Sequence, residues 1–260
     1  MLTYLNLLAK KSLPSTQVAD FQCHYSHCQA NLKQQQEFRK AMQIAPGQEL
    51  PISYEFLTAF PYILKVFADK RFAYKAIGLV HLSSEFQQFN NFDRALPFDL
   101  EINIYQGIEH PKGKEVKIVI EFHQQGQHCL SNTNVMLKRD KTDKPTAKKT
   151  QQMRQFQQEY FLLISHKLAR RYAKVSGDYN PIHLYDVSAK LFGFDRAIIH
   201  GMYMCHRLLL DKQIEVTHCK ANFKMPCKLP AKVGVCQQEQ HLIAFSDSDR
   251  LHMDIELFES

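Results

Sequence analysis

Apolar and polar residues alternate along several segments of the chain, with the period of a β-strand that buries one face. In residues 115–123 the apolar side of the segment holds Val116, Ile118, Ile120 and Phe122. Residues 100–104 and 251–257 alternate in the same way. This pattern predicts antiparallel strands near residues 77–83, 99–105, 115–123 and 128–137, and again near 215–223, 231–237, 240–247 and 250–258.

Two segments show helical spacing instead, and each precedes one set of strands. The first has apolar residues at positions 56, 60, 63, 64 and 67, although Pro61 is expected to kink or shorten this helix. The second follows Gly201, with an apolar stripe at positions 202, 205, 208 and 209. A sheet with one apolar face needs a cover, and one long apolar helix provides it. The chain is therefore predicted to be α+β and to form a hotdog twice, as a double hotdog with one continuous sheet.

The predicted division of the chain follows from this repeat. Residues 49–138 form the first hotdog and residues 156–260 the second, while the segment 139–155 is a basic, proline-containing linker. Residues 1–48 precede the repeat as an N-terminal extension. Within the extension, residues 29–43 have the composition of a polar helix, to which the sequence assigns no role.

Charge and cysteine content restrict the class of partner. The formal net charge of +7 favours an anionic partner, and nucleic acid, an anionic membrane or a phosphorylated cofactor such as coenzyme A would all fit. Nucleic acid is not expected, because the basic residues concentrate in the linker without aromatic residues beside them. The seven scattered cysteines are typical of reduced thiols. Without a predicted signal segment or membrane span, we expect a cytoplasmic protein, as a monomer or a homodimer.

The residues with chemical potential lie between positions 172 and 210. Gly177 can end a short helix in a left-handed conformation, and Asn180-Pro181 then enforces a turn. This loop presents Asp178 and His183 from opposite sides of one turn. A carboxylate and an imidazole held close together can activate a water molecule and transfer a proton.

The apolar helix that follows begins at Gly201. A glycine at a helix N-terminus exposes its N–H and lets a ligand approach the backbone closely. The helix dipole adds partial positive charge at that point. Such an N–H can donate a hydrogen bond to the developing enolate oxygen of a thioester, which is the task of an oxyanion hole.

The block SGDYNPIH, followed by Ala189 and by IIHGM, resembles the hydratase 2 motif of R-specific enoyl-CoA hydratases and MaoC-like dehydratases. The resemblance implies that Asp178 and His183 are the catalytic dyad and that Gly201 donates the oxyanion-hole N–H. It also implies that Asn180 orients the loop, and that Asn180, His200 and Met202 lie against the bound substrate. The substrate would be a thioester of coenzyme A or of an acyl carrier protein, with no metal and no redox cofactor.

The first half resembles the non-catalytic hotdog of two-domain MaoC-like proteins, in which a degenerate half helps to hold the acyl chain. It contains no Asp-x-Asn-Pro-x-His, so only the second half is expected to carry chemistry. The apolar helix near residues 56–67 fits a core element and an acyl pocket equally. Lys190 and Arg196, near the active loop, are candidates for contacting the phosphates of coenzyme A or a carrier protein.

Other interpretations of the same residues remain open. The scaffold also suits a hotdog thioesterase, in which a carboxylate directs water at the carbonyl carbon, or an acyl-thioester-binding protein without activity. Asp178 and His183 could simply satisfy a turn. His206 is expected to make a structural contact on its helix. The Cys23–Cys28 segment, with its two histidines, matches no common zinc spacing.

Overall fold

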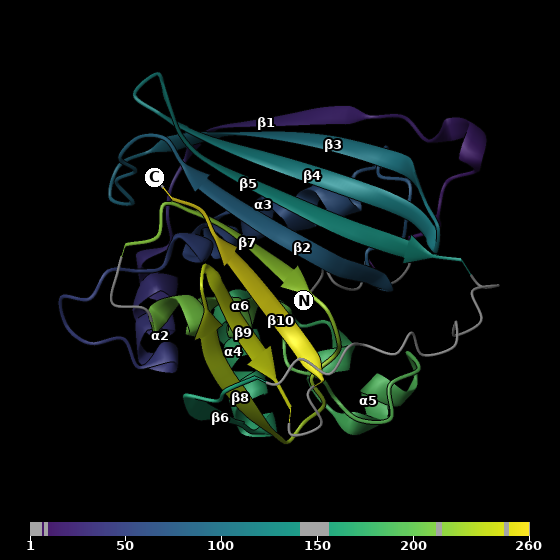
Figure 1. Ribbon diagram of the computed structural model, residues 1–260. Helices are drawn as coiled ribbons and strands as arrows, with labels where there is room; N and C mark the ends of the chain where they lie inside the picture. The colour runs from purple at the N-terminus through teal and green to yellow at the C-terminus, as the bar shows by residue number, and fades with distance from the viewer. Residues whose placement is uncertain (1–6, 8–9, 141–155, 212–214, 247–249, 260) are drawn as a thin grey trace.

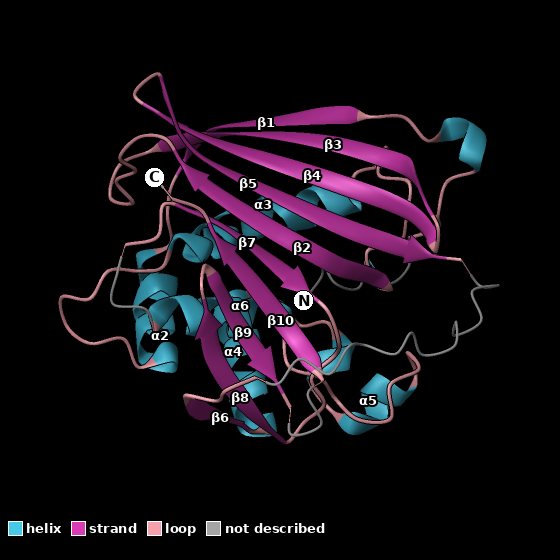
Figure 2. Cartoon of the chain, in the orientation of Figure 1, coloured by secondary structure: helices cyan, strands magenta, loops and turns pink. Residues whose placement is uncertain are grey.

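The computed structural model describes residues 7, 10–140, 156–211, 215–246 and 250–259. In this part of the chain ten strands form one antiparallel sheet, in the order β1-β3-β4-β5-β2-β7-β10-β9-β8-β6 (Figures 1 and 2). In chain order the strands are β1 (Phe21–Cys28), β2 (Leu79–Gln88), β3 (Phe98–His110), β4 (Gly113–Gln124), β5 (Gln127–Arg139), β6 (Tyr160–Ile164), β7 (His218–Phe223), β8 (Ala231–Gln238), β9 (His241–Phe245) and β10 (Leu251–Leu257). All eight strands expected from alternation are present, and the double hotdog is confirmed.

Helix α3 (Glu55–Ala68), which follows the single turn η2 (Ile52–Tyr54), covers the first half of the sheet (Figure 1). Phe56, Phe60, Ile63 and Phe67 are buried, as their spacing predicts. The expected shortening at Pro61 was wrong, because the helix continues to Ala68. A proline inside a helix costs about 3 kcal/mol. Burial of a single large apolar side chain contributes roughly 1.5–3 kcal/mol, so the several apolar residues on this helix outweigh that cost.

Helix α6 (Gly201–Leu210) occupies the matching place in the second half, beside α4 (His166–Ser176) (Figure 1). The two halves meet where β2 pairs with β7, from Ser83 opposite Asn222 to Gln87 opposite His218. This pairing makes the sheet continuous, so that both central helices lie under a single surface. Side chains of both halves therefore reach the space between the helices.

Within the predicted N-terminal extension, residues 21–42 have defined places in the fold. Strand β1 adds to the edge of the sheet by pairing with β3, and α2 (Leu32–Met42) packs beside α4 of the second half. Asn31 caps α2 by accepting a hydrogen bond from the backbone N–H of Gln34 at 3.0 Å. The helix over residues 29–43 was thus predicted, whereas β1 was not. Residues 141–155 of the proposed linker lie outside the described residues.

The core is continuous across both halves, and all seven cysteines are free thiols. His206 is buried on α6, and its Nδ1 lies 2.7 Å from the Ser53 hydroxyl of η2, which is the structural contact expected of it. In the described part of the chain, none of the helices combines the length and the apolar character that crossing a membrane requires.

Candidate active site

A short loop after α4 carries both members of the predicted dyad. Ser165 caps the start of α4, and Gly177 ends it with φ 76°, the left-handed conformation expected at this position. Asp178 follows, and its Oδ1 accepts a hydrogen bond from the Asn180 backbone N–H at 3.0 Å. Asn180 in turn caps the single turn η3 (Pro181–His183). Local hydrogen bonds therefore fix the loop between the two chemical groups.

His183 is held in one tautomer by its backbone partner. Its Nδ1 lies 2.9 Å from the carbonyl oxygen of Ile198, and a carbonyl oxygen can only accept a hydrogen bond. Nδ1 therefore carries the proton in the neutral ring, and Nε2 keeps its lone pair. Burial lowers the pKa of His183, more than the nearby Asp178 raises it. The side chain at neutral pH is thus an uncharged imidazole with a basic Nε2.

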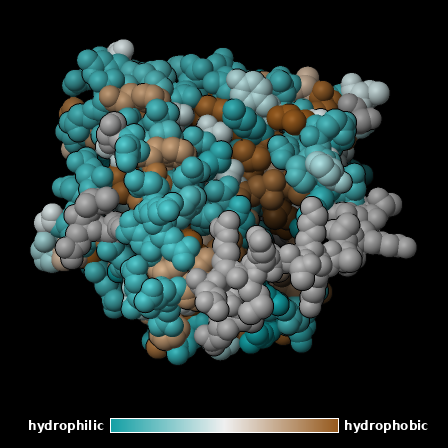
Figure 3. All heavy atoms as spheres, in the orientation of Figure 1, coloured by the Kyte–Doolittle hydropathy of each residue, from teal (hydrophilic) through white to brown (hydrophobic). Residues whose placement is uncertain are grey.

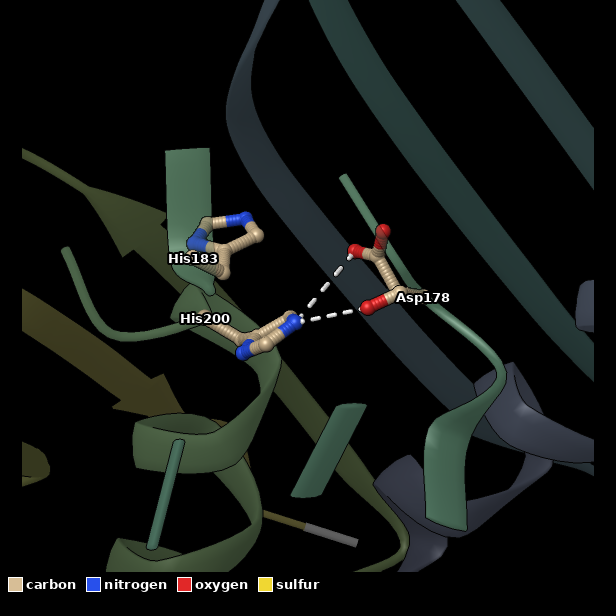
Figure 4. A group of neighbouring side chains, drawn as sticks. All are labelled: Asp178, His183 and His200. Atoms are coloured by element: carbon tan, nitrogen blue, oxygen red, sulfur yellow. Dashed lines mark hydrogen bonds and ion pairs between the residues drawn. The ribbon is translucent and has the colours of Figure 1, made fainter. Parts of the chain in front are cut away.

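His200, the residue before α6, contacts both Asp178 and His183 (Figure 4). Its ring stacks on that of His183, with 3.8 Å between the centroids and 28° between the planes. Its Nε2–H donates to the backbone carbonyl oxygen of Asp178 at 3.0 Å. Burial lowers the pKa of His200 to about 3, and the ring is therefore neutral.

Gly201 begins α6 at a point of close packing. A Cβ on this residue would lie 2.7 Å from Cδ1 of Phe223, so a larger residue does not fit without displacing that ring. The backbone N–H of Gly201 belongs to the first helical turn, whose amides have no acceptor within the helix. The partial positive charge of the helix N-terminus lies at the same place.

The six predicted site residues line one cavity of about 570 Å³ between the two halves: Asp178, Asn180, His183, His200, Gly201 and Met202. Ligand atoms of Asp178, His183 and His200 all lie within 4.8 Å of one another. In Figure 4 the Asp178 carboxyl group and the His183 ring face the same gap. The rest of the lining is largely apolar, and Figure 3 shows an apolar hollow on one face of the molecule.

The first half contributes wall residues that sequence analysis left undecided or missed. Phe56, Phe60, Leu64 and Phe67 of α3 line the cavity, so this helix serves as core and as pocket wall. His81 on β2 lines it as well, between the rings of Phe56 and Phe223. No local motif marks His81, because its neighbours in space come from distant segments.

A buried polar group on β2 and β5 fixes the orientation of His81. The side-chain amide of Asn132 donates to the carbonyl oxygen of Glu85 at 3.0 Å, which leaves its Oδ1 to accept from the Asn134 amide at 2.8 Å. Oδ1 of Asn134 then faces Nε2 of His81 at 3.1 Å, and this nitrogen must carry the proton. Burial lowers the pKa of His81 to about 4. Besides His183 and His200, a further neutral imidazole therefore lies in the wall of the cavity.

The trio of Asp178, His183 and His200 has the residue types of a metal site but not the geometry. Metal-binding lone pairs lie in the imidazole plane and must converge on one ion, whereas these two rings stack face to face. The Nε2 of His200 also donates a proton to the Asp178 carbonyl oxygen, so that nitrogen has no lone pair to offer. The residues therefore do not fit a metal ion and fit proton transfer better.

The sequence and the structure of this chain are similar to those of several known proteins. Residues 145–230 match the model of the MaoC like domain. The chain is 26% identical over 197 residues to 3-hydroxyacyl-thioester dehydratase X of Mycobacterium tuberculosis. The aligned region covers 73% of this chain and 70% of that protein.

Solved structures share the fold over most of the chain. A crystal structure of HtdX from Mycobacterium tuberculosis superposes with a TM-score of 0.79 at 21% identity, covering 91% of this chain and 99% of that one. The peroxisomal multifunctional enzyme type 2 of Drosophila melanogaster gives a TM-score of 0.64 at 13% identity, covering 92% of this chain and 48% of that one. Over residues 145–230 the sequence is thus similar to the MaoC like domain, and over 73% of its length the chain resembles the mycobacterial 3-hydroxyacyl-thioester dehydratase X.

Proposed function

We propose that this chain catalyses the reversible hydration of trans-2-enoyl thioesters to (R)-3-hydroxyacyl thioesters. The observation that carries the proposal is the placement of Asp178 and His183 in the wall of one largely apolar cavity, with ligand atoms within 4.8 Å. Two hydrogen bonds of about 2.8 Å each can bridge that separation through a single water molecule. The dyad can thus hold the water that is added or removed.

The tautomer of His183 supports a role for this residue as the proton acceptor in the first step of the proposed reaction. Because Nδ1–H donates to Ile198, Nε2 is the nitrogen that can accept a proton from the bound water. As that O–H bond breaks, the water oxygen forms a bond to C3 of the enoyl group. The π electrons move onto the thioester oxygen and give an enolate. The dyad then returns one proton to C2, which restores the carbonyl, and the net change is the addition of one water.

The start of α6 is suited to the charge that develops on the thioester oxygen. The Gly201 N–H and the helix dipole both favour negative charge there. Gly201 and the dyad line the same cavity. Removing one donor from an oxyanion hole costs about a hundredfold to a thousandfold in rate.

The apolar part of the cavity accounts for the acyl chain. Phe56, Phe60, Leu64 and Phe67 repeat at helical spacing along α3 and line the cavity in the first half. An alkyl chain placed there removes apolar surface from water on both sides. The first half would therefore hold substrate while the second half carries the chemistry, as the sequence resemblance implies.

The named relative supports the same class of reaction, since it is called a 3-hydroxyacyl-thioester dehydratase. The proposed reaction transfers protons and water only. It consumes no redox equivalent and calls for no cofactor beyond the coenzyme A or acyl carrier protein that forms part of the substrate.

The test is an assay with crotonyl-CoA and longer trans-2-enoyl-CoAs, in which loss of the enoyl-thioester absorbance is followed beside Asp178→Asn. The expected result is turnover to (R)-3-hydroxyacyl-CoA by the wild type and a loss of roughly a hundredfold to ten-thousandfold in the variant. Circular dichroism of the variant checks that the fold is intact.

Product analysis separates the proposal from its alternatives. Release of free thiol would identify a thioesterase and reject hydration. Binding of acyl thioesters without any turnover, on coenzyme A or on a carrier protein, would identify a binding protein. An (S)-hydroxy product would contradict the proposed stereochemistry while leaving the dyad in place.

A further inference from the structure

The mouth of the cavity can be located from residues that both line it and are exposed. In the second half these are Phe192, Gly193 and the segment Lys224–Pro226. Phe192 follows α5 (Asp186–Lys190), the short helix that comes directly after the dyad loop. A substrate that enters on the side of the second half therefore passes close to the end of α5.

Large apolar side chains are exposed on the segment beside this mouth. Val187 and Leu191 are 76% and 81% exposed, and they lie four residues apart, which places them on the same side of the helical turn. Phe192 and Met225 at the rim are exposed as well, at 37% and 44%. We name these four residues the mouth patch. Apolar groups gathered at a cavity entrance are typical of an interaction surface.

The charged residues around the mouth patch are mainly exposed cations, one of which, Arg196, also acts electrostatically on Asp186 and Asp195. Lys190, Arg196 and Lys224 are exposed, and within the described residues none of them has an ion pair. The two acidic residues of the same region are engaged: Asp195 with Lys228 at 2.8 Å, and Asp186 with His166 at 3.1 Å. The surface thus presents positive charge around an apolar centre.

We propose that the mouth patch is a docking surface for an acidic acyl carrier protein, which delivers the acyl thioester into the cavity on its flexible arm. This inference rests on the proposed function and names the partner for it. The phosphates of coenzyme A would use the cations but have no need of Val187 and Leu191. A second copy of this chain would bring like charges together, which disfavours self-association through this surface.

The kinetic test compares one trans-2-enoyl group carried on coenzyme A and on a purified acidic acyl carrier protein. The double variant Val187→Ser/Leu191→Ser removes the apolar contact without adding charge. The matched control, Leu163→Ser, changes a side chain that is 76% exposed on β6. For the carrier-bound substrate we expect the double variant to raise KM at least about tenfold, as expected for loss of a central apolar contact. Turnover of the coenzyme A thioester should be unchanged.

A binding measurement keeps the inference separate from the proposed function. Titration calorimetry with the loaded carrier protein should show binding to the wild type and the control, weaker binding to the double variant, and further weakening at high salt. Such binding without turnover would retain the docking surface and reject the hydratase. Normal turnover of coenzyme A thioesters, with carrier kinetics unaffected by the double variant, would overturn the docking surface and retain the hydratase. A wild-type dimer that the double variant converts to a monomer would also overturn it.

Discussion

The ring of His200 lies face to face with that of His183, 3.8 Å away, while its Nε2–H donates to the backbone of Asp178. One buried side chain thus contacts both members of the proposed dyad. The stack fixes the plane of the His183 ring, and the hydrogen bond fixes the loop that carries Asp178. His200 is therefore a positioning residue in the proposed mechanism.

Replacing His200 by phenylalanine tests this positioning role. Phenylalanine retains a ring to stack on His183 but cannot donate to the Asp178 carbonyl oxygen. We expect kcat to fall by roughly 10- to 100-fold, the usual cost of losing a group that orients catalytic residues, with little change in KM. Steady-state kinetics on an enoyl-CoA measure both. An unchanged kcat would show that the stack alone is sufficient.

The pH dependence of kcat/KM tests the assignment of His183 as proton acceptor. Only the neutral ring can accept a proton, and burial lowers the pKa of His183 in the folded protein. The active form therefore persists below the ordinary value of about 6.5 for histidine. For hydration we expect a level profile across neutral pH that declines only below pH 6.5. A decline that begins at or above 6.5 would contradict the assignment.

The variant Gly201→Ala tests the close packing at the start of α6. The added Cβ would meet Phe223 at 2.7 Å, and overpacking of this kind costs about 1–3 kcal/mol. We expect a lower melting temperature and lower activity. Combining the change with Phe223→Leu should restore much of the stability, because it removes the clash. If stability does not recover in the double variant, the ring contact is not its cause.

Buried neutral histidines predict a loss of stability in acid. Burial lowers the pKa of His206 and His200 to about 3 and that of His81 to about 4. The unfolded chain therefore binds more protons than the folded chain below about pH 6.5. The stability is fully present above that pH and is lost progressively as the pH falls toward the folded-state values. Each such residue contributes a slope of roughly 1.4 kcal/mol per pH unit.

The double variant Ser53→Ala/His206→Leu measures one of these contributions without leaving the Ser53 hydroxyl unpaired. Urea unfolding at several pH values below 6.5 measures the free energy of unfolding. We expect it to fall less steeply with decreasing pH than in the wild type, by the roughly 1.4 kcal/mol per pH unit that one bound proton contributes. The same slope in both proteins would mean that His206 does not titrate differently on unfolding.

A chelator distinguishes proton transfer from metal catalysis at the trio. Because the stacked rings do not converge on an ion, we expect dialysis against EDTA to leave the hydration rate unchanged. Loss of activity that zinc or another divalent ion restores would show that the rings rearrange around a metal.

Much of this fold was accessible from sequence, for local reasons. Strands such as β4 and β10 alternate between apolar and polar residues over most of their length, and Gly177 and Asn180-Pro181 define the dyad loop by backbone preferences alone. Strand β1 was missed although its burial alternates from Phe21 to Ser26, because it lies at the sheet edge and only Cys28 among its residues is fully buried. The shortening predicted at Pro61 does not occur, because burial of the apolar residues on the same helix outweighs the local preference of proline.

The parts of the site that could not be predicted depend on contacts between distant segments. The link between His81 and Asn134 joins β2 to β5, and the contact of Phe223 with Gly201 joins β7 to α6. No spacing within the chain encodes either one. The six motif residues, by contrast, lie within 25 positions and fold into one loop and one helix start.

The seam between β2 and β7 has a consequence for how such a chain can change. Because the two hotdogs on either side of this seam belong to one polypeptide, a substitution in one half is not copied into the other, as it would be in a pair of identical subunits. The Asp and His of the proposed dyad line the cavity from the second half alone, whereas the first half presents His81 and phenylalanines of α3. The proposed division of labour between the halves therefore depends on their being parts of one chain.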